Sequence, residues 1–155
     1  MGAAWNLGYF AAFAPSAAAI ALGGAVGPFG VLSVPTSFPQ PWFEGEGELY
    51  PVWHVLRGMA KLKGCPILPL RSSIPGAVRG LAAVTPEGTE LWLCNPSPTS
   101  REVKLPEGFA AAAVLDASSF IAASEQPDLL DRLTPLAART LSLDAYAVLR
   151  AVKPG

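Results

Sequence analysis

Apolar and polar positions alternate with a helical period from Leu49 to Pro66, in the stretch LYPVWHVLRGMAKLKGCP. Pro51 is suited to the first turn of a helix, Gly64 to its C-terminal cap, and Pro66 prevents the helix from continuing. We therefore predict an amphipathic helix over 51–63 that docks one face on an apolar surface. The apolar stripe on that face consists of Val52, Val55, Leu56, Met59 and Leu62.

The chain before this helix is apolar throughout. No Asp, Glu, Lys or Arg occurs from Met1 to Phe43. Gly2–Ala14 is Ala-rich and apolar on nearly every side, which predicts a helix that is buried all round and ends at Pro15. The run AAAIAL, Ala17–Leu22, predicts a strand covered on both faces, as in a parallel sheet. Helix, turn and buried strand are typical of an α/β fold, but the chain contains no predicted partner for this strand.

The connection Gly23–Gly47 is long, rich in proline and glycine, and carries several aromatic residues. Long connections within compact domains are usually functional or disordered, and here the aromatic side chains favour packing. Among them, Trp42 is a candidate for stacking on a sugar. Glu44, Glu46 and Glu48 alternate with glycines and predict a solvated acidic turn. A metal-binding or catalytic pair of carboxylates is the alternative.

After Cys65 the apolar positions follow a period of two residues, which is typical of half-buried strands. The sequence TPEGTE places Pro86 and Gly88 where a tight hairpin turn needs them. The segment 124–138 is the one long excursion, and its leucines predict a helical turn across one sheet edge. Short strands at this spacing predict an antiparallel β-sandwich. The candidate strands are residues 66–73, 77–85, 89–95, 100–106, 110–118, 138–143 and 145–152.

Length and charge narrow the class of protein. At 155 residues the chain is long enough for one core and marginal for two domains. A net charge of −1 gives no electrostatic footprint for nucleic acid or an anionic membrane surface. Two cysteines, Cys65 and Cys94, cannot form a disulfide framework, which favours a reducing compartment and a cytoplasmic location. Leu7–Leu22 approaches the length of a membrane span, but Pro15 and Ser16 interrupt it, so a buried segment is the favoured interpretation.

Motifs for catalysis, metal binding or phosphate binding are missing from the sequence. It contains no G-x-S-x-G, H-E-x-x-H, P-loop or Rossmann fingerprint. His54 is the only histidine, for which a partly buried structural role is the favoured interpretation and substrate binding the alternative. Asp116 and Asp144 lie at the ends of predicted strands, where aspartates usually cap turns. We therefore name Trp42 and His54 as candidate substrate-binding residues and predict no catalytic residue, metal or cofactor.

The order of these pieces resembles the C-terminal portion of the D-apionate lactonase family. The resemblance is carried by GAAWNLG, YPVWHVL, LWLCNPSP, VLDAS and the closing LSLDAYAVLR. It covers nearly the whole of this chain, but only the C-terminal part of a full-length member. In that family a glycoside-hydrolase-like (β/α)8 barrel is followed by a β-sandwich.

The resemblance implies a domain organisation. Residues 1–64 are expected to be a remnant of the C-terminal end of the barrel, its last helix–strand–helix unit, with the helix 51–63 docking the sandwich on the barrel wall. Residues 65–155 are expected to be the accessory sandwich. The expected fold is therefore mainly β: an antiparallel β-sandwich of about seven strands preceded by a partial α/β unit.

The resemblance transfers no catalytic residue. Members of the family carry an acidic residue just after this strand, where the present chain has LGGAVGPFG. A barrel active site is also assembled from the ends of several strands, and a single strand cannot supply it.

Three hypotheses of function follow. The leading one is a C-terminal fragment of a carbohydrate-active hydrolase, with lactone or glycoside hydrolysis in the full-length family, a structural sandwich, and no catalysis by this chain alone. Its expected partner is the missing N-terminal barrel, or a second copy bound through an exposed apolar patch. The alternatives are an autonomous carbohydrate-binding β-sandwich with Trp42 as the stacking platform, and a sandwich anchored in a membrane through Leu7–Leu22. The carbohydrate-binding alternative implies a sugar ligand. None of the three hypotheses implies binding to nucleic acid.

Overall fold

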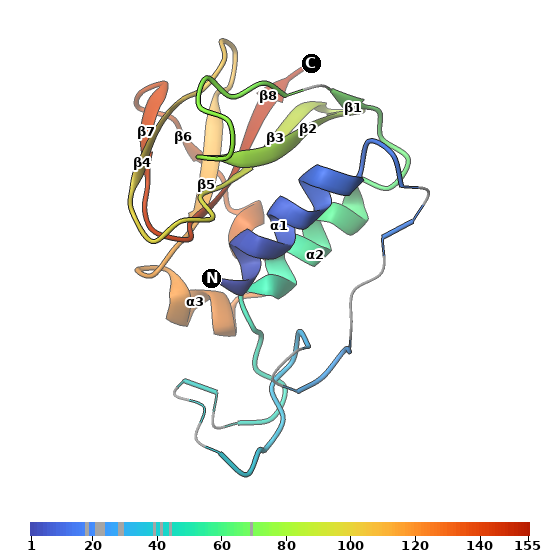
Figure 1. The fold of residues 1–155 in the computed structure, drawn as a ribbon, viewed down its shortest axis with the longest axis vertical. Helices are drawn as coiled ribbons and strands as arrows, with labels where there is room; N and C mark the ends of the chain where they lie inside the picture. The colour runs from blue at the N-terminus through green and yellow to red at the C-terminus, as the bar shows by residue number, and fades with distance from the viewer. Residues whose placement is uncertain are drawn as a thin grey trace.

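The chain folds into three layers: a pair of helices, a six-stranded sheet and a two-stranded sheet (Figure 1). The computed structural model describes residues 1–17, 19–20, 24–27, 30–38, 40, 42–43, 45–68 and 70–155. The helical elements are α1 (Gly2–Phe13), α2 (Val52–Lys61), α3 (Phe120–Glu125) and the 3-10 turn η1 (Leu129–Asp131). The strands are β1 (Ile67–Leu68), β2 (Arg79–Thr85), β3 (Gly88–Cys94), β4 (Arg101–Lys104), β5 (Ala111–Leu115), β6 (Thr134–Pro135), β7 (Thr140–Leu143) and β8 (Val148–Pro154).

The strands form the antiparallel sandwich that the two-residue period predicts. The larger sheet has the order β1-β2-β3-β8-β5-β6, and β4 pairs with β7 in the smaller one. β2 and β3 form the predicted hairpin, in which Thr85 pairs with Gly88. Gly88 has φ +140, a backbone conformation that glycine tolerates better than other residues.

The six-stranded sheet is buried on both of its faces. In β3, Trp92 and Cys94 pack into the core beneath the helices, whereas Leu91 and Leu93 pack into the core shared with β4 and β7. This opposite orientation of alternate residues is the one that the sequence predicts. The two cores therefore meet back to back on a single sheet, and β3 and β8 contribute to both.

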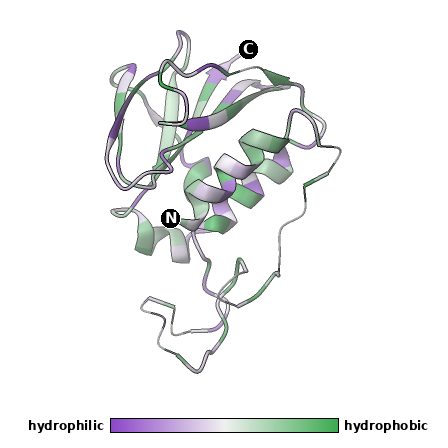
Figure 2. Cartoon of the chain, viewed as in Figure 1, coloured by the Kyte–Doolittle hydropathy of each residue, from purple (hydrophilic) through white to green (hydrophobic). Residues whose placement is uncertain are grey.

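The helices α1 and α2 lie side by side and parallel, with their N-terminal ends near α3 (Figure 1). Successive helices of a (β/α)8 barrel have this parallel relation. The predicted apolar stripe of α2 is directed inward, with Val55 fully buried and Leu62 nearly so. Purple, hydrophilic segments on the remainder of α2 can be followed in Figure 2.

The expectation that α1 is buried all round is not met by the residues of this chain. Its inner side, at Ala3, Ala4 and Leu7, packs into the core against α2 and the sheet. Its outer side leaves Trp5 60% exposed and Tyr9 44% exposed. A helix that is apolar on every side can bury only the side that a neighbour covers, and the described residues provide one such neighbour layer.

The predicted strand Ala17–Leu22 is not formed by the part of it that the structure describes. Ala17, Ala19 and Ile20 have no strand pairing, while Ala18, Ala21 and Leu22 lie outside the described residues. A parallel strand of a barrel is held by hydrogen bonds to neighbours on each side, so an apolar run alone does not produce it.

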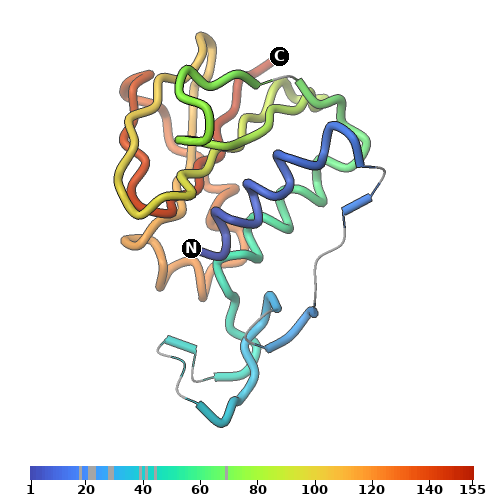
Figure 3. Tube along the Cα trace, viewed as in Figure 1, coloured from blue at the N-terminus to red at the C-terminus, as the bar shows by residue number. Residues whose placement is uncertain are grey.

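The described segments of residues 24–50 extend beyond the N-terminal end of α2, away from the sheets (Figure 3). Ser33 holds this connection together, because its hydroxyl donates to Gly45 O at 2.8 Å and accepts from Glu48 N at 2.9 Å. Leu49 N also donates to Ser124 O at 3.1 Å, which ties the connection to α3. Of the aromatic side chains expected to pack, Phe43 is buried, whereas Phe38 and Trp42 are exposed.

The segment 124–138 forms the predicted helical turn as η1, which contacts β5, and then adds the short edge strand β6. The preceding helix α3 is not anticipated by the sequence analysis, which extends a strand to residue 118. Its six residues are too short to show a helical period. Within the described residues, no helix has the length and apolar character needed to cross a bilayer.

Candidate functional site

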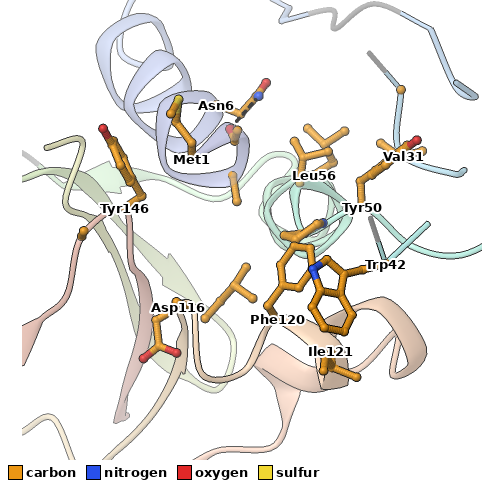
Figure 4. A pocket seen from close by; sticks show the side chains of 18 of the residues that line it. Met1, Asn6, Val31, Trp42, Tyr50, Leu56, Asp116, Phe120, Ile121 and Tyr146 are labelled. Carbon is orange, nitrogen blue, oxygen red and sulfur yellow. Dashed lines mark hydrogen bonds between the residues drawn. The ribbon is translucent and has the colours of Figure 1, made fainter. Parts of the chain in front are cut away.

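A cavity of about 820 Å³ lies where the helices meet the β-sandwich. Its walls come from the N-terminal ends of α1 and α2, the connection before α2, the turn after β5, and the turn before β8. Figure 4 shows Trp42 and Phe120 together on one side of the cavity and Asp116 and Tyr146 on the other. The volume is within the range of roughly 300–1,000 Å³ that small-molecule sites occupy.

Trp42, predicted as a stacking residue, lines this cavity. Its side chain is 64% exposed, and its φ of +75 lies in the left-handed region. Few residues other than glycine, asparagine and aspartate adopt that conformation, and a bulky side chain there is unusual. The backbone thus presents a large aromatic surface toward solvent at the rim of the cavity.

The residues beside Trp42 are anchored by aromatic packing. Phe43 is buried, with its ring centroid 4.5 Å from that of Tyr50 and 5.5 Å from that of Phe120. The Tyr50 hydroxyl donates to Gln40 Oε1 at 2.6 Å. The cluster attaches Phe43, the residue after Trp42, to Phe120 of α3.

Asp116 forms the polar wall of the cavity on the sandwich side. Its Oδ1 accepts hydrogen bonds from the amide and hydroxyl of Ser118, at 2.8 and 2.7 Å, and from the amide of Ser119 at 3.1 Å. Burial acts to raise the pKa of Asp116, but these hydrogen bonds outweigh it and hold the pKa below its usual value. The carboxylate caps the turn, as the sequence predicts, and is ionised at neutral pH.

His54, the other candidate substrate-binding residue, lies on α2 away from this cavity. It is only 3% exposed, and its Nε2 lies 2.9 Å from Ala123 O of α3. A neutral ring whose Nε2–H donates to this carbonyl satisfies the contact. Burial lowers the pKa of His54, which favours the neutral ring. The structure therefore does not bring Trp42 and His54 into one site, and the substrate-binding role of each stays a prediction.

The acidic turn contains no metal site among the described residues. Glu44 lies outside the described residues, and Glu48 Oε2 accepts from Gly45 N at 3.3 Å. Within the described part of the chain, no three His, Cys, Asp or Glu side chains are grouped so that they could hold a metal ion.

An ion cluster centred on Asp131 joins α2 to the sandwich, and the sequence analysis did not anticipate it. The Asp131 carboxylate accepts from Arg57, from Lys61 at 2.8 Å and from Arg150 at 2.9 Å. Arg150 in turn donates to Glu90 at 2.6 Å. Burial acts to raise the pKa of Asp131, but Lys61 and Arg57 outweigh it and lower the pKa. Four elements of the chain meet here, which no local pattern in the sequence could reveal.

The comparisons with known proteins agree with this arrangement of helices and strands. The model of the D-apionate lactonase TIM barrel domain matches residues 1–64. The model of the D-apionate lactonase C-terminal immunoglobulin-like domain matches residues 75–151. No curated protein matches the chain.

One solved structure that is similar to the chain is a GH30 endoxylanase from Clostridium papyrosolvens C71, at 16% sequence identity and a TM-score of 0.47. The similarity covers 69% of this chain and 28% of the endoxylanase chain. The present chain thus corresponds to well under half of that protein.

The fold and the two family models define the class as part of a TIM barrel domain followed by an immunoglobulin-like β-sandwich. The two matching models together cover most of the chain, and both describe parts of one family. The chain belongs to the D-apionate lactonase family.

Proposed function

We propose that this chain is the C-terminal part of a carbohydrate-active hydrolase, in which the sandwich braces two helices of the barrel and catalyses nothing by itself. The observation that carries the proposal is the two-sided environment of α1. Ala4 and Leu7 are fully buried against the rest of the chain, while Phe13 on the outer side is 47% exposed. An apolar helix with one covered side is what a barrel helix presents when only one of its neighbours is present.

The outer side of α1 is an aromatic stripe. Trp5, Tyr9 and Phe13 follow one another at intervals of four residues, so they lie along one side of the helix. The Tyr9 and Phe13 rings are 4.7 Å apart between centroids. Aromatic side chains dominate the energetics of cores and interfaces, which supports the rest of the barrel as the partner that covers this stripe.

The chemistry of the described residues supports the absence of independent catalysis. Barrel active sites are assembled at the carboxyl ends of several parallel strands. In the described part of residues 1–64, two helices are present together with the isolated bridges Val26–Leu32 and Leu32–Leu49. The single histidine is buried and bonded to a backbone carbonyl, so it is poorly placed to act as a general base.

The alternative of an autonomous carbohydrate-binding sandwich is supported less well. Sugar-binding surfaces of sandwiches often use exposed aromatic rings. In the part of the chain that the structure describes, the exposed aromatic side chains lie before residue 65: Trp5, Tyr9, Phe13, Phe38 and Trp42. The sandwich alone therefore has no obvious stacking platform.

The proposal is tested by the association behaviour of the chain and a variant of its aromatic stripe. We expect the chain to bind a hydrophobic dye and to self-associate with increasing concentration in analytical ultracentrifugation, because the stripe is uncovered. The double variant Trp5→Gln/Phe13→Gln should lose most of both effects. Phe38→Gln, which changes an exposed aromatic residue elsewhere, should leave them unchanged. A chain that stays monomeric and binds no dye would overturn the proposal.

A further inference from the structure

We propose that the cavity at the junction of the helices and the sandwich binds a neutral sugar, with Trp42 as its stacking surface. The proposal goes beyond a bracing role for the sandwich, since it assigns a ligand to residues that both parts of the chain contribute. It rests on the proposed function in one respect: the ligand class is that of a carbohydrate-active protein.

The conformation of Trp42 is the first argument. A left-handed backbone at a bulky residue is unfavourable and persists only where the surroundings impose it. Here Phe43 N donates to Gln40 O at 2.9 Å, and the buried Phe43 ring is held against Tyr50 and Phe120. Trp42 itself is 64% exposed and lines the cavity.

The composition of the walls is the second argument. The apolar C–H face of a sugar ring can cover an indole, while its hydroxyl groups need polar partners at the edge. Asn6 and Asp116 supply such groups on the walls from α1 and from the turn after β5. Ser118 and Ser119 donate to Oδ1 of Asp116, and in the described structure Oδ2 of this carboxylate has no protein donor. An ionised acceptor of this kind suits the hydroxyls of a neutral sugar and disfavours an anionic one.

The joint origin of the site is the third argument. Trp42 precedes α2, whereas Asp116 and Tyr146 belong to the sandwich, and Tyr146 also has a positive φ of +58. Tyr146 N donates to Ser97 O at 3.2 Å, which fixes the turn before β8 at the cavity edge. Residues from separate parts of the chain thus line one cavity, and Figure 4 shows Tyr146 on the side opposite Trp42.

The experiment is a titration of the whole chain with cellotetraose and, separately, xylotetraose, which are neutral linear oligosaccharides. Binding is followed by calorimetry and by the indole N–H resonances of the tryptophans in NMR spectra. We expect saturable binding of at least one probe, with a shift of the resonance that is missing from the Trp42→Phe spectrum. Trp42→Ala should weaken binding by about tenfold or more.

Matched variants separate stacking from folding. Trp42→Phe keeps an aromatic surface and should retain most of the affinity, while Phe38→Ala, an exposed aromatic residue outside the cavity walls, should bind like the parent chain. No binding of either probe, or equal affinity in Trp42→Ala, would overturn the proposal. Failure here leaves the dye binding and self-association of the aromatic stripe unaffected, so that the two proposals fail separately.

Discussion

Gly58 of α2 lies directly against the indole ring of Trp92 in β3. A Cβ atom at Gly58 would overlap the edge of this ring, which is itself 1% exposed and pinned by a hydrogen bond from Trp92 Nε1 to Glu90 at 3.1 Å. The helix therefore approaches the sheet as closely as its backbone allows. The contact joins the part of the chain that matches the barrel domain to the part that matches the immunoglobulin-like domain.

Gly58→Ala is expected to destabilise the fold, although alanine is the better helix former. The gain in helix propensity is about 1 kcal/mol, whereas overpacking a core contact costs about 1–3 kcal/mol, and the Trp92 ring has no room to move. Because a Cβ atom at Gly58 would lie far inside van der Waals contact with the ring, the cost is expected in the upper part of this range, with a net loss of about 1–2 kcal/mol in the free energy of unfolding, measured by urea denaturation.

Gly2→Ala is the matched control for this change. Gly2 is also helical, but a Cβ atom there meets nothing within 4 Å. The free energy of unfolding of the Gly2→Ala variant should be equal to or above that of the parent chain. Equal stability of the two variants would contradict the close contact between α2 and β3.

Asp131→Asn is expected to weaken the attachment of α2 to the sandwich. The substitution keeps the shape of the side chain but removes the charge that Arg57, Lys61 and Arg150 share. Hydrogen bonds to charged groups contribute about 1.5–3 kcal/mol each, and partial exposure reduces this, so we expect a loss of about 1–3 kcal/mol at pH 7. Hydrogen exchange should show faster opening of α2 than of β3.

The loss of stability caused by Asp131→Asn should shrink as the pH falls. Because the pKa of Asp131 is lowered in the folded chain, its stabilisation is present above the unfolded value of about 3.9 and disappears as the pH falls through the folded value. The parent chain and the variant should therefore converge in stability in strong acid. Asp128→Asn, which changes an exposed pair with Arg132, should have a much smaller effect than Asp131→Asn at neutral pH.

His54 is expected to make the free energy of unfolding depend on pH between about 5 and 7, a higher pH range than that of Asp131. Its pKa is lowered in the folded state by burial, so the unfolded chain binds the proton more readily below about pH 6.5. The free energy of unfolding should fall as the pH decreases from 7 toward 5. His54→Gln can still donate to Ala123 O but cannot take up the proton, and it should flatten this slope in urea titrations at several pH values.

The two cysteines are expected to differ in reactivity. Cys94 is fully buried beneath the helices, and burial raises the pKa of its thiol to about 12. Cys65 is partly exposed. A thiol reagent such as DTNB should modify one cysteine rapidly in the folded chain and the second only in denaturant, since the thiolate is the reactive form. The burial of Cys94 would be contradicted if both cysteines were modified rapidly in the folded chain, or if the Cys65→Ser variant were still modified rapidly.

Local patterns predict those elements whose determinants are close together in sequence. The alternation in β3, the Pro86–Gly88 turn and the capped amphipathic α2 all depend on neighbours within a few residues. The prediction of a strand over Ala17–Leu22 was wrong for the residues of this run that the structure describes. Strand pairing depends on partners whose positions the sequence alone does not give. α3 was missed because six residues are too few for a period to be visible.

The candidate site divides in the same way. The sequence identified Trp42 as a candidate for stacking, since a tryptophan in a Pro- and Gly-rich connection has few local partners. It could not identify the wall formed by Asp116 and Tyr146, which lies more than 70 residues further along the chain. The separation of His54 from Trp42 was likewise not predictable, because it depends on which side of α2 faces α3.

By itself, the sequence determined the class of the sandwich, the limits of α1 and α2, and the membership of a family, because periodicity, caps and short motifs are encoded locally. The tertiary structure alone decided which side of α1 stays uncovered, that Asp131 joins α2 to β8, and that Trp42, Asp116 and Tyr146 border one cavity. These depend on contacts between residues far apart in the chain, whose free energy is realised only when several elements have packed together.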